Sequence, residues 1–136
     1  MGYMTDGLTF NTLRGGNIAR LPEFRNSKGE AAHSQADGSD WSLNDWVTAV
    51  TGELGEAANV FKKIRRGDLT LDEARSMLTQ ELADVVIYLD ILAAQAGIDL
   101  GMAVMETFNT KSIKVGSRVR LAADDWHYVS IPTEEI

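Results

Sequence analysis

The chain has 136 residues, of which 44% are hydrophobic and 24% are charged, and its formal net charge is −7. This length and composition predict a single globular domain whose core is large enough to fold without crosslinks. The negative charge argues against general nucleic-acid binding, which needs a basic surface, and the absence of cysteine excludes disulfides and thiolate metal sites.

The N-terminal segment, MGYMTDGLTF, has neither the basic stretch nor the apolar stretch of a signal peptide. The longest apolar run, VVIYLDILAA, is too short to span a bilayer. We therefore expect a cytoplasmic protein. Apolar residues recur at a roughly helical spacing between Leu8 and Phe24, which predicts a short first helix, although Gly15, Gly16 and Pro22 weaken the pattern.

A clearer helix is expected after a loop. Residues 26–41 are polar and contain two glycines, which predicts a surface loop. Ser42 followed by Asp45 resembles a capping box at the start of the second helix. Apolar residues then recur at helical spacing as far as Phe61, and four cations stand just before Gly67, a pattern typical of a helix C-terminus.

Two more helices are marked by their capping residues. Thr70 and Glu73 form a capping box for a third helix that runs to about Gly97. Asp99 can cap a fourth helix that ends near Gly116.

The last segment, residues 117–136, has no helical period, so we expect an irregular tail that is either extended or disordered. The order of elements indicates one all-α domain over residues 1–136. We expect a helical hairpin with flanking helices, in a four-helix-bundle-like arrangement.

Two carboxylate pairs stand out on the second and third helices. Glu53 with Glu56, and Glu81 with Asp84, are each three residues apart, so each pair projects from one face of its helix. Such pairs are usually solvated surface charges. Here Glu53 borders the apolar stripe, and the other pair lies in a segment that is apolar nearly all round, which predicts that this segment is buried.

None of the four carboxylates has a Lys or Arg three or four residues away to offset its charge. A short connection joins the two helices, so we expect them to pack antiparallel and to bring the pairs together. Two unit charges at 4 Å repel by about 4 kcal/mol at an effective dielectric of 20, so four clustered carboxylates need protons or a cation. Oxygen ligands alone suit Mg²⁺ or Mn²⁺. We therefore predict a metal site.

The same residues carry a resemblance to a known family. The sequence GELGEAA at 52–58 and the sequence ELADVVIY at 81–88, with 24 residues between Glu56 and Glu81, resemble the paired E-x-x-E and E-x-x-D motif of the MazG-like nucleoside triphosphate pyrophosphohydrolases. The resemblance covers about residues 40–116. It is closest to small phage-type or bacterial members in the WSLNDW and FNTK segments at 41–46 and 108–111.

The resemblance implies an all-α MazG-type fold and the hydrolysis of a nucleoside or deoxynucleoside triphosphate to the monophosphate and pyrophosphate. It also implies that the four carboxylates hold Mg²⁺ and form the catalytic site, and that the protein is a homodimer or homotetramer. Apolar surface on more than one side of residues 81–94 independently favours a homo-oligomer, and we expect its interface to lie close to the site or to complete it.

Five further positions are candidate substrate contacts. Relatives have a tyrosine at the position of Tyr88 and an asparagine at that of Asn109, and several have a lysine four residues earlier, where this chain has Met105. Each of these positions also has a structural interpretation, such as core packing or the cationic end of a helix. The five candidates are Trp41, Lys63, Tyr88, Asn109 and Lys111.

A ferritin-like di-metal bundle needs Glu-x-x-His on two helices. Here Glu30-x-x-His33 falls in the predicted loop, and His127 follows Asp124 rather than a glutamate, which argues against that class. The alternative that stays open is a non-catalytic helical module that binds metal or nucleotide.

Overall fold

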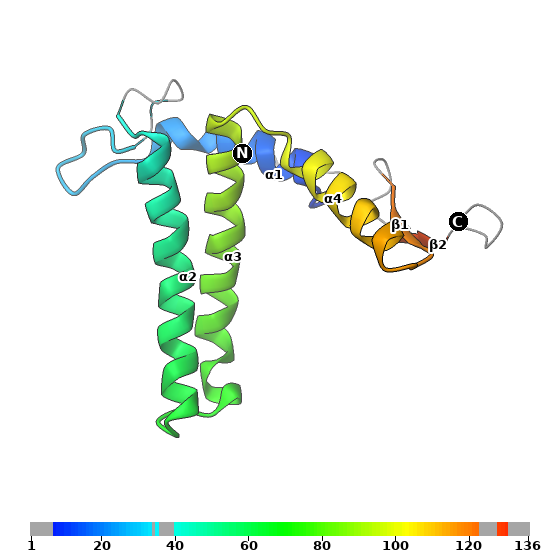
Figure 1. Cartoon of the computed structure of the whole chain (residues 1–136). Helices are drawn as coiled ribbons and strands as arrows, with labels where there is room; N and C mark the ends of the chain where they lie inside the picture. Colours follow the sequence, from blue (N-terminus) through cyan, green and yellow to red (C-terminus); the bar gives the residue numbers. More distant parts are fainter. Residues whose placement is uncertain (1–6, 34, 36–39, 123–127, 131–136) are drawn as a thin grey trace.

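The protein is mostly helical, as Figure 1 shows, and the all-α prediction is confirmed. The computed structural model describes residues 7–33, 35, 40–122 and 128–130. His127 and most of the predicted tail lie outside the described residues. The elements in chain order are α1 (Phe10–Arg20), a 3₁₀ turn η1 (Leu21–Glu23), α2 (Leu43–Arg65), α3 (Leu71–Gln95), α4 (Leu100–Lys114), β1 (Val119–Leu121) and β2 (Tyr128–Ser130).

Helices α2 and α3 form a long antiparallel hairpin and lie side by side along their length (Figure 1). Both begin where the capping residues predicted. The hydroxyl of Ser42 accepts a hydrogen bond from the amide of Asp45, and that of Thr70 accepts one from the amide of Glu73. Gly67, with φ +83°, makes the tight turn that reverses the chain.

Two clusters of buried apolar residues hold the hairpin together. Toward its tip, Ala57 and Val60 of α2 pack against Ala74 and Leu78 of α3. At its other end Trp46, which is 1% exposed, packs with Leu21 and Ile91 and so joins α2, η1 and α3. The carboxylate-bearing turns of both helices lie between these two clusters, which fix the spacing of the helices there.

A buried polar network attaches α1 to α3. Asp90 is 1% exposed, and its two carboxylate oxygens accept hydrogen bonds from Arg14 Nε at 3.1 Å and Asn17 Nδ2 at 2.9 Å. A second guanidinium nitrogen of Arg14 donates to the carbonyl of Ile98 at 2.8 Å, just before α4 begins. The network therefore ties α1 to both α3 and the α3–α4 junction.

Helix α4 starts from the Asp99 cap and turns away from α3 by 104°. In Figure 1, α1 crosses one end of the hairpin, and α4 leads away from that same end instead of running along the hairpin. The four helices are thus a hairpin with two flanking helices, and α1 and α4 do not extend the hairpin into a parallel-sided bundle. Among the described residues no single helix meets the length and hydropathy of a membrane span; α3 and α4 meet them only as a bent pair.

The expectation that the apolar segment at 81–94 is buried on all sides is wrong for this chain. Leu82 is 48% exposed, Val86 47% and Leu89 38%. Val86 lines a groove with Leu13 of α1 and Val104 of α4, and these helices leave it half exposed.

Part of the expected irregular tail is extended, as one of its two alternatives predicted. Val119–Leu121 pairs antiparallel with Tyr128–Ser130, so the described part of the segment contains a short sheet. The β-branched and aromatic residues in these strands favour extended backbone. The side chain of Asn109 also anchors β1 to α4: its amide donates to the carbonyl of Leu121 at 3.0 Å and accepts from the amide of Leu121 at 2.8 Å.

The expected surface loop at 26–41 is exposed in part but not throughout. The Asn26 side-chain oxygen accepts hydrogen bonds from the amides of Lys28 and Glu30 and closes a turn. His33 and Trp41, by contrast, are half-buried and turn toward the core, where their rings lie 4.6 Å apart between centroids.

Candidate metal centre

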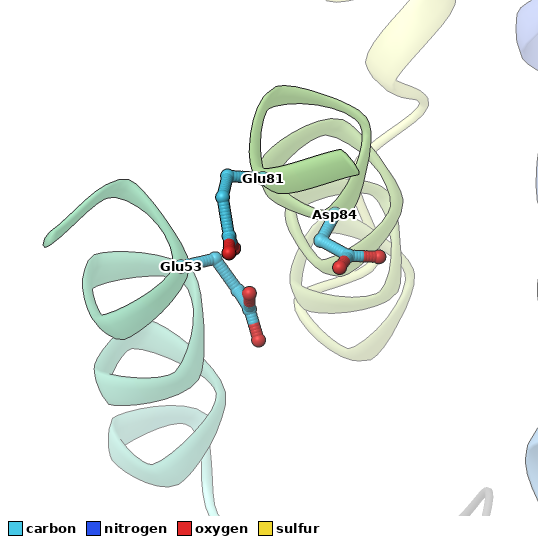
Figure 2. Close-up of side chains that lie close together, drawn as sticks. All are labelled: Glu53, Glu81 and Asp84. Atoms are coloured by element: carbon cyan, nitrogen blue, oxygen red, sulfur yellow. The ribbon is translucent and has the colours of Figure 1, made fainter. Parts of the chain in front are cut away.

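Three carboxylates from the two hairpin helices converge at one point. Figure 2 shows Glu53 on α2 and Glu81 and Asp84 on α3, with the side chains of Glu53 and Glu81 directed toward each other between the helices. One oxygen atom from each of the three carboxylates lies within 4.8 Å of the others. All three residues are partly buried. The structure therefore brings together three of the four residues predicted from sequence.

The fourth carboxylate, Glu56, is exposed and stands outside this group of three. It remains close enough to hydrogen-bond the carboxyl of Glu81, and its charge acts on both Glu53 and Glu81. Glu56 is thus part of the same electrostatic cluster, on its solvent side.

The proximity of these acids changes their ionisation. Burial raises the pKa of Glu53, and the negative charges of Glu56 and Asp84 raise it further. Burial likewise raises the pKa of Glu81, with a hydrogen bond to Glu56 and the charges of the other three acids acting in the same direction. The charged form of the cluster is therefore disfavoured in the absence of a cation.

No basic side chain relieves this repulsion within the part of the chain that the structure describes. Arg14–Asp90, Arg66–Asp68 and Arg75–Asp72 are ion pairs between described residues, and none of these includes a residue of the cluster. The sequence places no cation near these acids on their own helices, and none of these tertiary ion pairs between described residues supplies one.

Tyr88 lies one helical turn beyond Asp84 and connects the acids to an aromatic group. Burial raises the pKa of its phenol, and the charges of Glu53 and Asp84 raise it further, whereas Arg20 acts in the opposite direction. The Tyr88 ring also packs 6.2 Å from that of Trp46, centroid to centroid. Tyr88 therefore borders both the carboxylates and the core. This position is compatible with a substrate contact and with a role in core packing.

Arg20 is a residue near this site that sequence reasoning did not identify. It is the last residue of α1, is exposed, and its guanidinium carbon lies 5.7 Å from the centroid of the Phe24 ring. Its positive charge reaches Tyr88. No sequence pattern links it to Tyr88, because their proximity arises from the packing of α1 across α3.

Trp41 belongs to a group of aromatic rings rather than standing alone. Its ring meets that of Trp46 edge-on at 4.7 Å and lies 4.6 Å from that of His33. His33 also lies 5.1 Å from Phe24, and its φ of +45° is unusual for a residue other than glycine. Trp41 is half-buried, so part of its ring stays accessible, while Trp46 is a core residue.

The remaining three predicted contacts are not brought to the carboxylates within this chain. Lys63 lies ten residues after Glu53 on the same helix, which at 1.5 Å per residue is about 15 Å along the axis. Asn109 is engaged with the backbone of Leu121. Lys111 is exposed on α4, beside Thr107 and Lys114.

The donor set fits a hard divalent cation. Carboxylate oxygens suit Mg²⁺ and Mn²⁺, and two ligands at about 2.1 Å from one ion lie at most about 4.2 Å apart. The present separation of up to 4.8 Å is close to this limit, so small rotamer changes would suffice to bring the oxygens together. The three partly buried acids form no ion pair with a basic side chain among the described residues, so their negative charge is available to offset that of a divalent cation.

Comparison with protein-family models, with curated proteins and with solved structures gave no match for this chain. The geometry and chemistry of the carboxylate cluster therefore carry the functional argument.

Proposed function

We propose that this protein is a nucleoside triphosphate pyrophosphohydrolase of the MazG-like kind, dependent on Mg²⁺ or Mn²⁺. The observation that carries the proposal is the convergence of Glu53, Glu81 and Asp84 from two antiparallel helices within 4.8 Å. The spacing of these residues in the chain resembles the paired motif of that family. A cytoplasmic location goes with this proposal.

When bound, the metal would supply Lewis acidity, which offsets phosphate charge and lowers the pKa of an attacking water. Glu53, Glu81 and Asp84 would hold it. Glu56, which stands on the solvent side of the cluster, is the acid least committed to the group of three, and we assign it the role of orienting the water or accepting its proton.

The substrate would lie across the open side of the hairpin between the acids and the aromatic residues. Tyr88 borders the acids, and its hydroxyl would donate to a phosphate or sugar oxygen. Arg20 supplies a positive charge on this side of the molecule and would contact the triphosphate. The exposed part of the Trp41 ring would stack on the base.

The proposal is tested by measuring turnover of the common nucleoside and deoxynucleoside triphosphates, with metal and with EDTA, for the wild type and for Glu81→Gln and Arg20→Ala. We expect Glu81→Gln to lose activity, and Arg20→Ala to raise KM about tenfold. Arg65→Ala, at the far end of α2, is the matched control for the loss of one exposed arginine and should leave KM unchanged. A protein that binds triphosphates with metal but does not turn them over would be the non-catalytic module instead.

A further inference from the structure

The imidazole ring of His33 lies at a junction of aromatic rings to which the proposed function assigns no role. Its centroid is 5.1 Å from that of Phe24 and 4.6 Å from that of Trp41. It also meets the buried ring of Trp46 edge-on at 5.8 Å. These separations are typical of stacked and edge-to-face aromatic contacts. His33 therefore connects Phe24 to both tryptophans.

The backbone of His33 is held in an unfavourable conformation. Its φ of +45° lies in the left-handed region that glycine adopts at no cost and that other residues seldom enter. Such a conformation persists where the surrounding structure enforces it, and it is often found at functional sites. Here the ring of His33 is packed between Phe24 and Trp41, which gives the backbone a reason to keep this conformation.

The orientation of the Trp41 ring depends on two neighbouring rings. Trp41 precedes the N-cap Ser42, so the helical hydrogen bonds of α2 do not hold it. Its ring contacts that of Trp46, the fourth residue of α2, at 4.7 Å in the manner of a hydrophobic staple. His33 supplies the second contact, an offset stack inclined by 38°. Trp46 is fixed in the core, so the side chain of His33 limits the remaining freedom of Trp41.

The same ring links Trp41 to Arg20. The guanidinium carbon of Arg20 lies 5.7 Å from the centroid of the Phe24 ring, and Phe24 in turn contacts His33. A continuous row of contacts therefore leads from Arg20 through Phe24 and His33 to Trp41. In the proposed function, one end of this row contacts the triphosphate and the other stacks on the base. His33 thus helps to fix the spacing between these two ends.

We infer that His33 is a positioning residue that holds Trp41 in the orientation needed to stack on a nucleotide base. It acts through Trp41 and takes no part in the chemistry at the carboxylates. The inference rests on the proposed function, because the base belongs to the proposed substrate. A purely structural role for His33 predicts changes in stability, whereas a positioning role predicts changes in nucleotide affinity.

Three variants separate the ring of His33 from its backbone. His33→Gly and His33→Asn remove the ring and leave residues that readily adopt a positive φ, so the loop should keep its conformation. His33→Phe keeps an aromatic ring at the same position. Lys28→Ala, at an exposed position of the same loop, is the control.

The first measurement is steady-state turnover of a nucleoside triphosphate with Mg²⁺. Because base stacking contributes binding and not chemistry, the two ringless variants should raise KM about tenfold and leave kcat within about twofold of the wild type. His33→Phe should restore most of the affinity. The near-ultraviolet circular dichroism of the tryptophans should weaken in the ringless variants, with unchanged helical signal in the far ultraviolet. A wild-type KM in both ringless variants would overturn the inference and leave the proposed hydrolase untouched.

A second measurement does not depend on catalysis. Binding of each common nucleoside monophosphate in EDTA can be followed by isothermal titration calorimetry. The wild type should bind at least one of them about tenfold more tightly than His33→Gly. If this difference is found but no triphosphate is turned over, the positioning role stands and the hydrolase proposal fails. If the wild type neither binds a monophosphate nor turns over a triphosphate, both are wrong.

Discussion

The carboxyl groups of Glu53 and Glu81 face each other across the α2–α3 hairpin, and with Asp84 they bring three carboxylate oxygens within 4.8 Å (Figure 2). In each helix the residues that set this distance are small or apolar neighbours such as Ala57 and Leu78, which pack one turn away. The acids are therefore held together by the hairpin core, whether or not their charges are offset. Repulsion among the acids should therefore lower the stability of the metal-free protein.

Removing one charge from the cluster should stabilise the metal-free protein or leave its stability unchanged. In EDTA, Glu53→Gln and Glu81→Gln should melt at or above the temperature of the wild type, because each substitution relieves repulsion among the acids. Thermal unfolding followed by circular dichroism measures this. Glu106→Gln, an exposed glutamate on α4, is the control and should change stability by less than about 0.5 kcal/mol. A clear destabilisation by both cluster variants would show that the acids do not repel one another.

Adding metal should stabilise the wild type more than a variant that lacks one of the acids. A ligand that binds only the folded state stabilises it by about 2.7 kcal/mol at a hundredfold excess over its Kd. The melting temperature of the wild type should therefore rise when Mg²⁺ or Mn²⁺ is added, and Glu81→Gln should lose most of that rise. If the two proteins respond identically to metal, Glu81 is not a ligand.

The metal-free protein should become less stable as the pH rises above the ordinary glutamate pKa of 4.5. In the folded state the pKa values of Glu53 and Glu81 are raised, so between 4.5 and these values the folded state binds more protons than the unfolded chain. The free energy of unfolding then falls as the pH rises through this interval and levels off above it. Urea unfolding in EDTA from pH 4.5 to neutrality should show a smaller fall for Glu53→Gln. A difference between the two proteins that is constant over this range would contradict the assignment.

The buried ion pair should contribute far more to stability than an exposed one. Arg14→Leu leaves the carboxylate of Asp90 buried without its cation and frees the carbonyl of Ile98, which should cost roughly 3 kcal/mol. Arg75→Leu breaks the exposed pair with Asp72 and should cost less than about 1 kcal/mol. Urea unfolding of both variants gives the comparison. Equal costs would mean that the buried Arg14–Asp90 pair contributes no more to stability than the exposed one.

The parts of the structure that follow from local sequence were predicted well. Ser42, Thr70 and Asp99 cap their helices through contacts three residues along the chain, so α2, α3 and α4 begin where the pattern indicated. The meeting of Glu53 and Glu81 also follows from helical period and one short connection.

Features that depend on distant contacts were not predicted. Arg14 pairs with Asp90, which lies 76 positions later in the sequence, and no local pattern near either residue predicts the pair. The engagement of Asn109 with Leu121 depends on how the chain folds back after α4, and the same is true of the strand that it anchors. The position of Arg20 near Tyr88 likewise depends on how α1 crosses α3.

The identity of the phosphate product tests the proposed reaction most directly. The wild type, incubated with Mg²⁺ and a mixture of the common nucleoside triphosphates, can be followed by phosphorus NMR. We predict that at least one triphosphate is converted to its monophosphate and pyrophosphate in equal amounts, and that the conversion stops with EDTA and is absent in Glu81→Gln. Release of orthophosphate, conversion that persists in EDTA, or no conversion of any triphosphate would contradict the proposed function.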